Sequence, residues 1–208
     1  MIMIILLWVG LVGALLMFGG DMLLYYSKEN YQQDGTYRPL VEIMKKLPAW
    51  RLQAGGMIGP IAAFFYCVGF AHLLYLFKEE HIVMAWVAFL CTCLGVIVGG
   101  AYHSHWSYMG LFAKIEDQKA MDIVLALKKK LEIVMYVFEG IGFMLLLLGV
   151  MHEWTAYPLY YFLFTPGFLF ILLPLLRKIP QPFYLCIVGG WSNLISVIYY
   201  IAALLFFM

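Results

Sequence analysis

The residues best suited to chemistry are polar side chains inside apolar stretches. Glu139 lies in Val137-Phe138-Glu139-Gly140-Ile141, Asp21 follows Gly19-Gly20, and His103 ends Gly99-Gly100-Ala101-Tyr102-His103. A carboxyl group in an apolar medium tends to keep its proton, and a histidine titrates near neutrality, so such a set can donate and accept protons. We predict an acid–base site in which Glu139, His103 and Asp21 take the catalytic roles.

A second set of polar and aromatic residues is expected to bind a ligand beside these three. His103 and His105 are two residues apart and cannot face one point on a regular helix, so the deeper His103 is expected at the centre. The predicted ligand-binding residues are Asn193, Trp191, Ser192, Tyr25, Gln53 and His105.

Each of these residues also has a purely structural interpretation. Asp21 can pair with Arg51, Asn193 can bridge two helices, and either histidine can lie at the membrane interface. Glu139 is harder to explain, because its own apolar stretch offers no basic side chain within a helical turn. It must be protonated, paired across helices or hydrated by a cavity.

Other kinds of site have no signature. The sequence lacks the motifs of nucleophilic hydrolases and of phosphate-binding loops, and Cys67, Cys91, Cys93 and Cys186 follow no zinc spacing. A metal held by His103, Asp21 and Glu139 is a minor alternative, because no local ligand motif supports it. No cofactor and no metal is therefore predicted.

Composition indicates where these residues lie. The chain has 208 residues, of which 65% are hydrophobic and only 12% are charged, with a net charge of +1. Soluble domains carry about 25% charged residues, and one core of this size could not bury so much apolar surface. A soluble domain, a disordered chain and a nucleic-acid-binding module are excluded, which leaves a polytopic membrane protein with membrane lipids as partners.

Six stretches are long and apolar enough to cross a bilayer, since a span needs about 20 residues. We therefore predict an all-α fold, a single six-helix transmembrane domain over residues 1–208. The expected spans are residues 2–26, 52–77, 82–102, 131–151, 157–176 and 182–207. The fifth span is expected to kink at Thr165-Pro166-Gly167.

Basic residues predict the orientation. All Lys and Arg residues except Lys78 fall in the segments 27–51, 103–130 and 177–181. The positive-inside rule makes these loops cytoplasmic and places both termini outside. His72 falls on the outer side, where a solvated interface is the default expectation.

The cytoplasmic segments have helical patterns of their own. Leu40, Ile43, Met44 and Leu47 form one apolar face after Pro39, which predicts a short amphipathic helix. This helix can lie on the inner leaflet or pack on the ends of the bundle, and the sequence favours neither. The segment 114–130 is also expected to be helical and to run into the fourth span.

Glycine pairs occur at a similar depth in four of the spans. They can allow close packing of helices, or they can remove side-chain volume and leave a cavity. The pairs are Gly19-Gly20, Gly55-Gly56, Gly99-Gly100 and Gly189-Gly190.

The segment Gly20-Asp21-Met22-Leu23-Leu24-Tyr25, followed by Gly59-Pro60 and Gly69-Phe70-Ala71-His72, resembles a family of small bacterial six-span membrane proteins of unknown function. The resemblance is best over the first two spans. It implies the fold class and a bacterial inner membrane, and it implies no activity. The set of Glu, His, Asn and Trp is also similar in kind to sterol-isomerase-like membrane enzymes, but its order and spacing differ, so no roles are transferred.

These observations predict an integral membrane protein with a polar pocket in its cytoplasmic half. The pocket would bind a lipophilic small molecule and modify it by acid–base chemistry. Two alternatives stay open: a transporter or proton-coupled carrier with Glu139 as the proton site, and a structural membrane component without a ligand. The sequence leaves the oligomeric state open.

Overall fold

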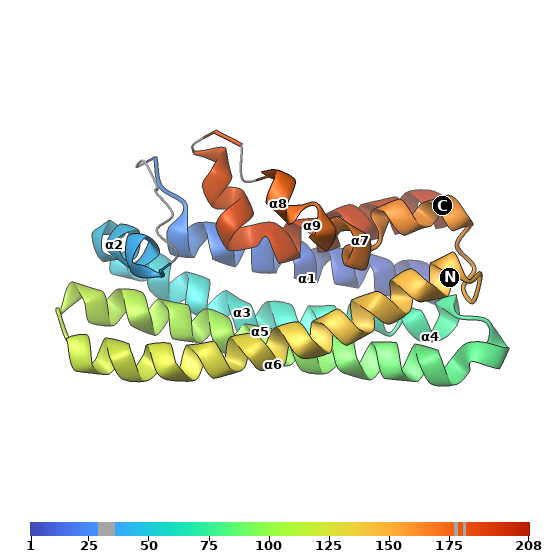
Figure 1. Cartoon of the computed structure of the whole chain (residues 1–208), viewed down its shortest axis with the longest axis horizontal. Coiled ribbons are helices and arrows are strands. Elements are labelled where there is room, and N and C mark those ends of the chain that lie inside the picture. Colours follow the sequence, from blue (N-terminus) through green and yellow to red (C-terminus); the bar gives the residue numbers. More distant parts are fainter. Residues whose placement is uncertain (29–35, 177–178, 181) are drawn as a thin grey trace.

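The computed structural model describes residues 1–28, 36–176, 179–180 and 182–208. Within this part of the chain there is no strand, apart from an isolated bridge between Phe77 and Thr155, and the all-α class is confirmed. The helices, drawn in Figure 1, are α1 (Ile2–Tyr25), α2 (Arg38–Lys46), α3 (Ala49–Phe70), α4 (Leu73–Leu76), η1 (Glu79–His81), α5 (Ile82–Lys114), α6 (Gln118–Met151), η2 (Leu159–Phe164), α7 (Pro166–Ile171), α8 (Leu173–Leu176) and α9 (Phe183–Phe207).

Within the described residues, five helical stretches are long and apolar enough to cross a membrane. Their outward faces carry large exposed apolar side chains, including Trp8, Met57, Phe64 and Trp86. Such a surface suits lipid and is unsuited to water. The five stretches are Ile2–Tyr25, Ala49–Leu76, Glu79–Lys114, Gln118–Met151 and Gly189–Phe207.

The segment expected as the fifth of six spans is not one helix. It is divided into η2, α7 and α8, and Thr165, with an extended backbone (φ −70°, ψ 142°), separates η2 from α7. Proline has no N–H to donate and its ring clashes with the preceding turn, so Pro158, Pro166 and Pro174 prevent a continuous helix. The expected kink at Thr165-Pro166-Gly167 is a complete interruption of the helix, since η2 ends before Thr165 and α7 begins after it.

The third and fourth spans are longer than expected. α5 continues to Lys114 and α6 begins at Gln118. Residues 103–114, expected in a loop, are therefore helical, and the expectation that the segment 114–130 is helical and continues into the fourth span is confirmed apart from the turn at residues 115–117. The turn between them includes Glu116 in the left-handed region (φ 57°). Asp117 then starts α6, because its carboxylate accepts a hydrogen bond from the Ala120 N–H at 3.0 Å.

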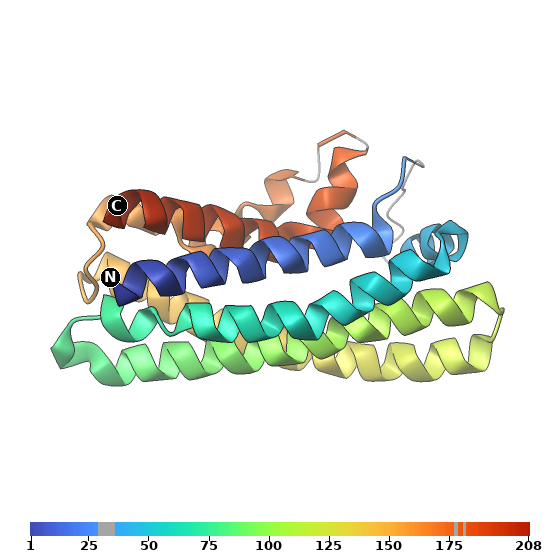
Figure 2. The ribbon, with the colours of Figure 1, turned by 180° about the vertical axis from the view of Figure 1, so that it is seen from behind.

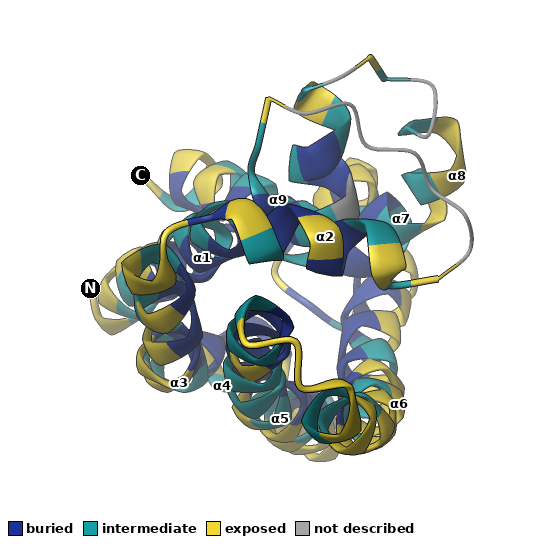
Figure 3. Ribbon diagram, turned by 90° about the vertical axis from the view of Figure 1, so that its left-hand side faces the viewer, coloured by how far each residue is buried: buried dark blue, intermediate teal, exposed yellow. Residues whose placement is uncertain are grey.

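The amphipathic helix α2 packs against the bundle. Its apolar residues Leu40, Ile43 and Met44 are buried in a cluster that includes Leu52 and Trp106. Viewed along the bundle, α2 lies across the ends of the long helices (Figure 3). The structure therefore favours the second of the two expected arrangements, packing on the bundle ends.

The long helices form an incomplete ring. α9 packs on α1, α1 on α3, α3 on α5, and α5 on α6, while the short α7 packs on both α6 and α9 (Figures 1 and 2). Both termini lie at the end of the bundle that carries α4, and α2 lies at the opposite end. Since α7 is short, the wall between α6 and α9 is the thinnest part of the ring.

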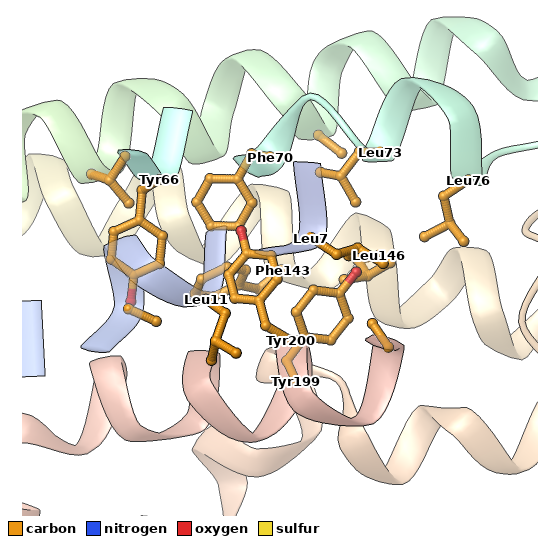
Figure 4. Packing of buried hydrophobic residues seen from close by; sticks show 14 of the residues in the cluster. Leu7, Leu11, Tyr66, Phe70, Leu73, Leu76, Phe143, Leu146, Tyr199 and Tyr200 are labelled. Atoms are coloured by element: carbon orange, nitrogen blue, oxygen red, sulfur yellow. The ribbon is translucent and has the colours of Figure 1, made fainter. Parts of the chain in front are cut away.

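The end of the bundle near α4 is filled by a tightly packed apolar core, which we call the packed end. It is built on aromatic rings that lie close together in Figure 4; Phe70 and Tyr66 stack with centroids 5.5 Å apart, and Phe70 and Tyr200 are 6.1 Å apart. Its principal residues are Leu7, Leu11, Phe70, Leu73, Phe143, Leu146, Tyr199 and Tyr200.

Candidate functional site

Four helices meet in a hydrogen-bonded group around Asp21, which we call the polar cluster (Asp21, Tyr25, Tyr66, His103 and Asn193). One carboxylate oxygen of Asp21 accepts a hydrogen bond from the Tyr25 hydroxyl at 2.9 Å and lies 3.1 Å from Nε2 of His103. The other accepts from the Asn193 amide at 2.7 Å, and Asn193 in turn accepts from the Tyr66 hydroxyl at 3.1 Å. The cluster therefore links α1, α3, α5 and α9.

Asp21 is 2% exposed and His103 is 4% exposed. A buried carboxylate is tolerated when its oxygens are hydrogen-bonded, and Asp21 has three partners. Arg51, the alternative partner considered for Asp21, binds the end of α1 instead: its guanidinium donates to the carbonyl oxygens of Met22, Leu23 and Tyr26 at 2.8, 3.2 and 3.0 Å. Arg51 thereby links α3 to the C-terminal end of α1, where the Met22 carbonyl also accepts the Tyr26 backbone N–H at 3.1 Å.

Glycines bring α3 and α5 together next to His103. A Cβ on Gly59 would lie 2.8 Å from the Gly100 carbonyl oxygen, and a Cβ on Gly100 would lie 3.0 Å from that of Gly59. A larger residue at either position would push the helices apart and move His103 away from Asp21. These glycines thus serve close packing, whereas Gly99 and Gly189 line the cavity described next.

A cavity of about 200 Å³ lies beside the polar cluster, and Asp21, His103 and Asn193 form part of its wall. Glu139 of α6 also lines it, is 8% exposed, and packs against Gly95 and Gly99 of α5. Within the described residues, Glu139 has no hydrogen-bond or ion-pair partner. The cavity thus contains one carboxyl group with three partners and one with none.

Aromatic rings make up much of the remaining wall. The indole N–H of Trp191 is buried without a hydrogen-bond partner in the described part of the chain, and so is Nδ1 of His103. The eight aromatic lining residues are Tyr25, Tyr66, Tyr102, Trp106, Tyr136, Phe170, Tyr184 and Trp191.

The cavity reaches the bundle surface between α6 and α9. Tyr136 lines the cavity and is nevertheless 47% exposed, and Leu173 and Tyr184 line it while remaining half-buried. α8 and the first turns of α9 lead away from the bundle axis at this level (Figure 1). The cavity wall therefore includes residues of α6, α8 and α9 that are exposed or half-buried.

Seven of the nine predicted site residues line this one cavity: Glu139, His103, Asp21, Asn193, Trp191, Ser192 and Tyr25. Gln53 does not line it and is exposed on α3. His105 does not line it either: its Nδ1 lies 2.8 Å from the Ala101 carbonyl oxygen and its ring packs against Tyr108.

Tyr66, Tyr102, Trp106, Tyr136 and Tyr184 were not predicted as cavity residues. Aromatic residues in apolar stretches look the same in a sequence whether they face lipid or the bundle interior. Only Tyr136 carried a usable signal, because it lies three residues before Glu139 and therefore on the same side of α6.

A second buried charge lies next to the cavity. Lys128, expected in a cytoplasmic loop, is 0% exposed, and its ammonium lies 3.3 Å from the centroid of the Tyr37 ring, 4.6 Å from that of Trp106 and 4.9 Å from that of Tyr102. Glu132 is its ion-pair partner at 3.2 Å and accepts a hydrogen bond from the Tyr37 hydroxyl at 2.6 Å. Burial and this hydrogen bond raise the pKa of Tyr37 above its ordinary value.

Other site chemistry finds little support in the described residues. They contain no group of three or more His, Cys, Asp or Glu residues placed to hold a metal ion. The four cysteines are free and half-buried. A larger open depression of about 770 Å³ between α2 and the α5–α6 turn has mixed charge, from Arg38, Lys129, Glu42 and Asp122.

Comparison with known proteins gives a family and no activity. The search of curated proteins and the search of solved structures each found no match. The model of a family of unknown function, DUF6796, matches residues 1–208, and the chain belongs to this family.

Proposed function

We propose that this protein is a membrane-embedded binding protein for a lipophilic small molecule, with Glu139 as the polar anchor that exchanges a proton with it. One observation carries the proposal: Glu139 lines a cavity in an apolar bundle and has no partner among the described residues. Placing an ionisable group at such a depth costs about 2.5–3.5 kcal/mol on insertion scales, and the fold recovers none of this cost through a partner of Glu139.

In this proposal η2, α7 and α8 together form a sixth crossing. All described Lys and Arg residues except Lys78 belong to the α2 end of the bundle, so the positive-inside rule makes that end cytoplasmic and both termini external. Loops 27–51 and 177–181 and the α5–α6 turn would then face the cytoplasm of a bacterial inner membrane, and the cavity would lie in the cytoplasmic half.

The size of the cavity sets how the molecule would bind. Pockets that enclose a whole drug-sized ligand measure about 300–1,000 Å³. A cavity of about 200 Å³ holds only one end of such a ligand. The polar end would meet Glu139, and the apolar remainder would extend between α6 and α9 into the bilayer.

The two carboxyl groups would have different roles. Glu139 has no partner among the described residues, so it can hold a proton and release it to a bound molecule. Asp21 is held by Tyr25, Asn193 and His103 and would orient His103. Trp191 and Ser192 would orient the ligand.

A binding protein is favoured over a carrier because of the packed end. A carrier opens its site first to one side of the membrane and then to the other, so transport would require the packed end to rearrange. Here Phe70, Phe143, Tyr199 and Tyr200 fill the bundle above the cavity and are all buried. The proposed access is therefore lateral and one-sided.

The test is to identify what the protein retains on purification. The wild-type chain, Glu139→Gln and the control Glu80→Gln, which removes an exposed carboxylate at the α4 end, would be purified in mild detergent and extracted for mass spectrometry. We expect one lipophilic molecule enriched over bulk lipid in the wild type and the control and depleted in Glu139→Gln. Identical lipid profiles in all three proteins would contradict the proposal and favour a purely structural protein.

A further inference from the structure

Within the described residues, one carboxyl group of the cavity has no basic partner. The ionisable lining residues other than tyrosines are Asp21, Glu139 and His103, and neither lysine nor arginine is among the lining residues in the described part of the chain. Asp21 lies 3.1 Å from Nε2 of His103 and accepts hydrogen bonds from Tyr25 and Asn193. Glu139 has no counter-ion among the described residues, so an occupant that accepts its proton and becomes positively charged would complete the site.

Aromatic rings favour the same charge. A cation over the face of a Trp, Tyr or Phe ring is attracted by the ring's electrons, and the attraction grows when water is excluded. Tyr136 lies on the same side of α6 as Glu139, and Trp191 of α9 and Tyr25 of α1 line the same cavity. A carboxylate with rings around it is a suitable environment for an ammonium group.

The protein already binds one ammonium in this way. Lys128 is fully buried among the rings of Tyr37, Tyr102 and Trp106, with Glu132 as its only ion-pair partner among the described residues. Tyr102 and Trp106 also line the cavity. The cavity therefore repeats a combination of aromatic rings and an acidic side chain, and directly beside the cavity this combination is occupied by a cation.

We infer that the molecule bound in this cavity is a lipophilic amine, whose headgroup takes the proton of Glu139 and pairs with it as a cation, and whose apolar tail leaves between α6 and α9. This inference rests on the proposed function and specifies its ligand. A headgroup that cannot become positive would give Glu139 no counter-ion, and an anionic headgroup would be repelled by the ionised form of Glu139.

The experiment compares two probes of equal chain length. Saturable binding of radiolabelled dodecylamine, which is an ammonium in its protonated form, and of 1-dodecanol would be measured with the full chain in phosphatidylcholine nanodiscs, each against excess unlabelled probe. The variants are Glu139→Gln, which removes the charge, Glu139→Asp, which keeps it, and the control Glu80→Gln. Helix content and thermal unfolding of each variant would be recorded beside the binding data.

We expect the wild type and Glu80→Gln to bind the ammonium probe saturably and the alcohol weakly or not at all. Glu139→Gln should weaken ammonium binding about 30-fold or more, as expected for removing one partner of a buried charge pair. Glu139→Asp should retain the preference for the cation, which shows that the charge, and not a general loss of folding, causes the effect.

The other outcomes separate the two proposals. Saturable binding of the alcohol that equals or exceeds binding of the ammonium, and that still depends on residue 139, would overturn the cationic ligand and leave the binding function standing. Failure of both probes to bind the wild type would contradict the inference and the proposed function together. Equal ammonium binding by Glu139→Gln and wild type would overturn the assigned role of Glu139.

Discussion

Two buried histidines show how the two ends of this bundle differ. His72 in the packed end is 0% exposed, and its ring nitrogens lie 2.7 Å from the Gly69 carbonyl oxygen and 2.6 Å from the Tyr199 hydroxyl. His103 in the polar cluster has Asp21 at Nε2, but its Nδ1 has no partner among the described residues. One histidine is fully satisfied by the fold, and the other is not.

An unpartnered polar atom alone does not mark a site. The Tyr200 hydroxyl in the packed end is also without a partner in the described residues, yet it packs against Gly10 and Gly69 and leaves no room for a ligand. Near Glu139 the unpartnered groups adjoin a cavity of about 200 Å³. The combination of free hydrogen-bonding capacity and space is what distinguishes the proposed binding region.

The largest expected effect is a loss of stability in the packed end. Phe70→Ala removes a buried ring that contacts Tyr66, Phe143 and Tyr200, and we expect it to lower the free energy of unfolding by about 3–5 kcal/mol. Thermal unfolding in detergent would measure this. Ligand retention by the folded fraction should be unchanged, and a selective loss of ligand would contradict the division between the two ends.

Asp21→Ala should have the next largest effect. It removes the group that Tyr25, His103 and Asn193 share, and we expect a loss of about 3 kcal/mol, the cost of leaving buried partners unpaired. Asp21→Asn keeps one oxygen acceptor and should lose less. If both variants unfold at the wild-type temperature, the polar cluster does not stabilise the bundle.

The two histidines give a matched pair of substitutions. His72→Phe leaves the Tyr199 hydroxyl without its histidine partner and should cost about 2 kcal/mol, while the Gly69 carbonyl keeps the backbone N–H of residue 72 at 3.1 Å. His103→Phe removes one of three partners of Asp21 and should cost about 1 kcal/mol. We expect His72→Phe to unfold at a lower temperature than His103→Phe, and the opposite order would contradict the comparison.

The smallest effect is expected at the surface pair of Lys45 and Glu116, 2.7 Å apart. The pairing raises the pKa of Lys45 and lowers the pKa of Glu116. Because the folded pKa of Glu116 is lowered, its contribution is complete above the ordinary glutamate pKa and is lost as the pH falls through the lowered value. Since exposed pairs contribute little, Glu116→Gln should leave the unfolding temperature at neutral pH unchanged within error. A clear drop at neutral pH would show a larger role for α2 docking.

Much of the fold could be predicted from the sequence. Long runs of apolar residues predict the membrane-crossing helices, because such runs are typical of membrane spans. The i, i+3, i+4 spacing of Leu40, Ile43 and Met44 predicts the amphipathic helix α2. The secondary structure of the segment 157–176 is harder to predict, because its composition suits a membrane span while its three prolines prevent a single helix. The helix over most of 114–130 could be predicted from its apolar pattern, whereas the continuation of α5 beyond residue 102 could not, because polar residues at the end of a span are also typical of a loop.

The sequence predicts how deep in the membrane the site residues lie, but it does not predict which side of its helix each residue occupies. Counting residues along a span places Asp21, His103, Glu139 and Asn193 at a similar level, and all four line the cavity. Gln53 was selected by the same reasoning and faces outward, because depth does not determine which side of a helix a residue occupies. The burial of Lys128 depends on a contact with Tyr37, which lies far from it in the sequence. Local sequence patterns do not predict contacts of this kind.

The most direct test of the account is the reaction of the protein with dicyclohexylcarbodiimide, an apolar reagent that adds a protonated carboxyl group across its C=N bond. The wild-type chain, washed free of bound lipophiles and placed in nanodiscs, would be treated with the reagent, and the modified residues would be identified by peptide mass spectrometry. We predict modification at Glu139 and little at Asp21, whose oxygens are already held by three partners. No modification at Glu139, or equal modification of both carboxyl groups, would contradict a lipid-accessible cavity with one unpartnered acid.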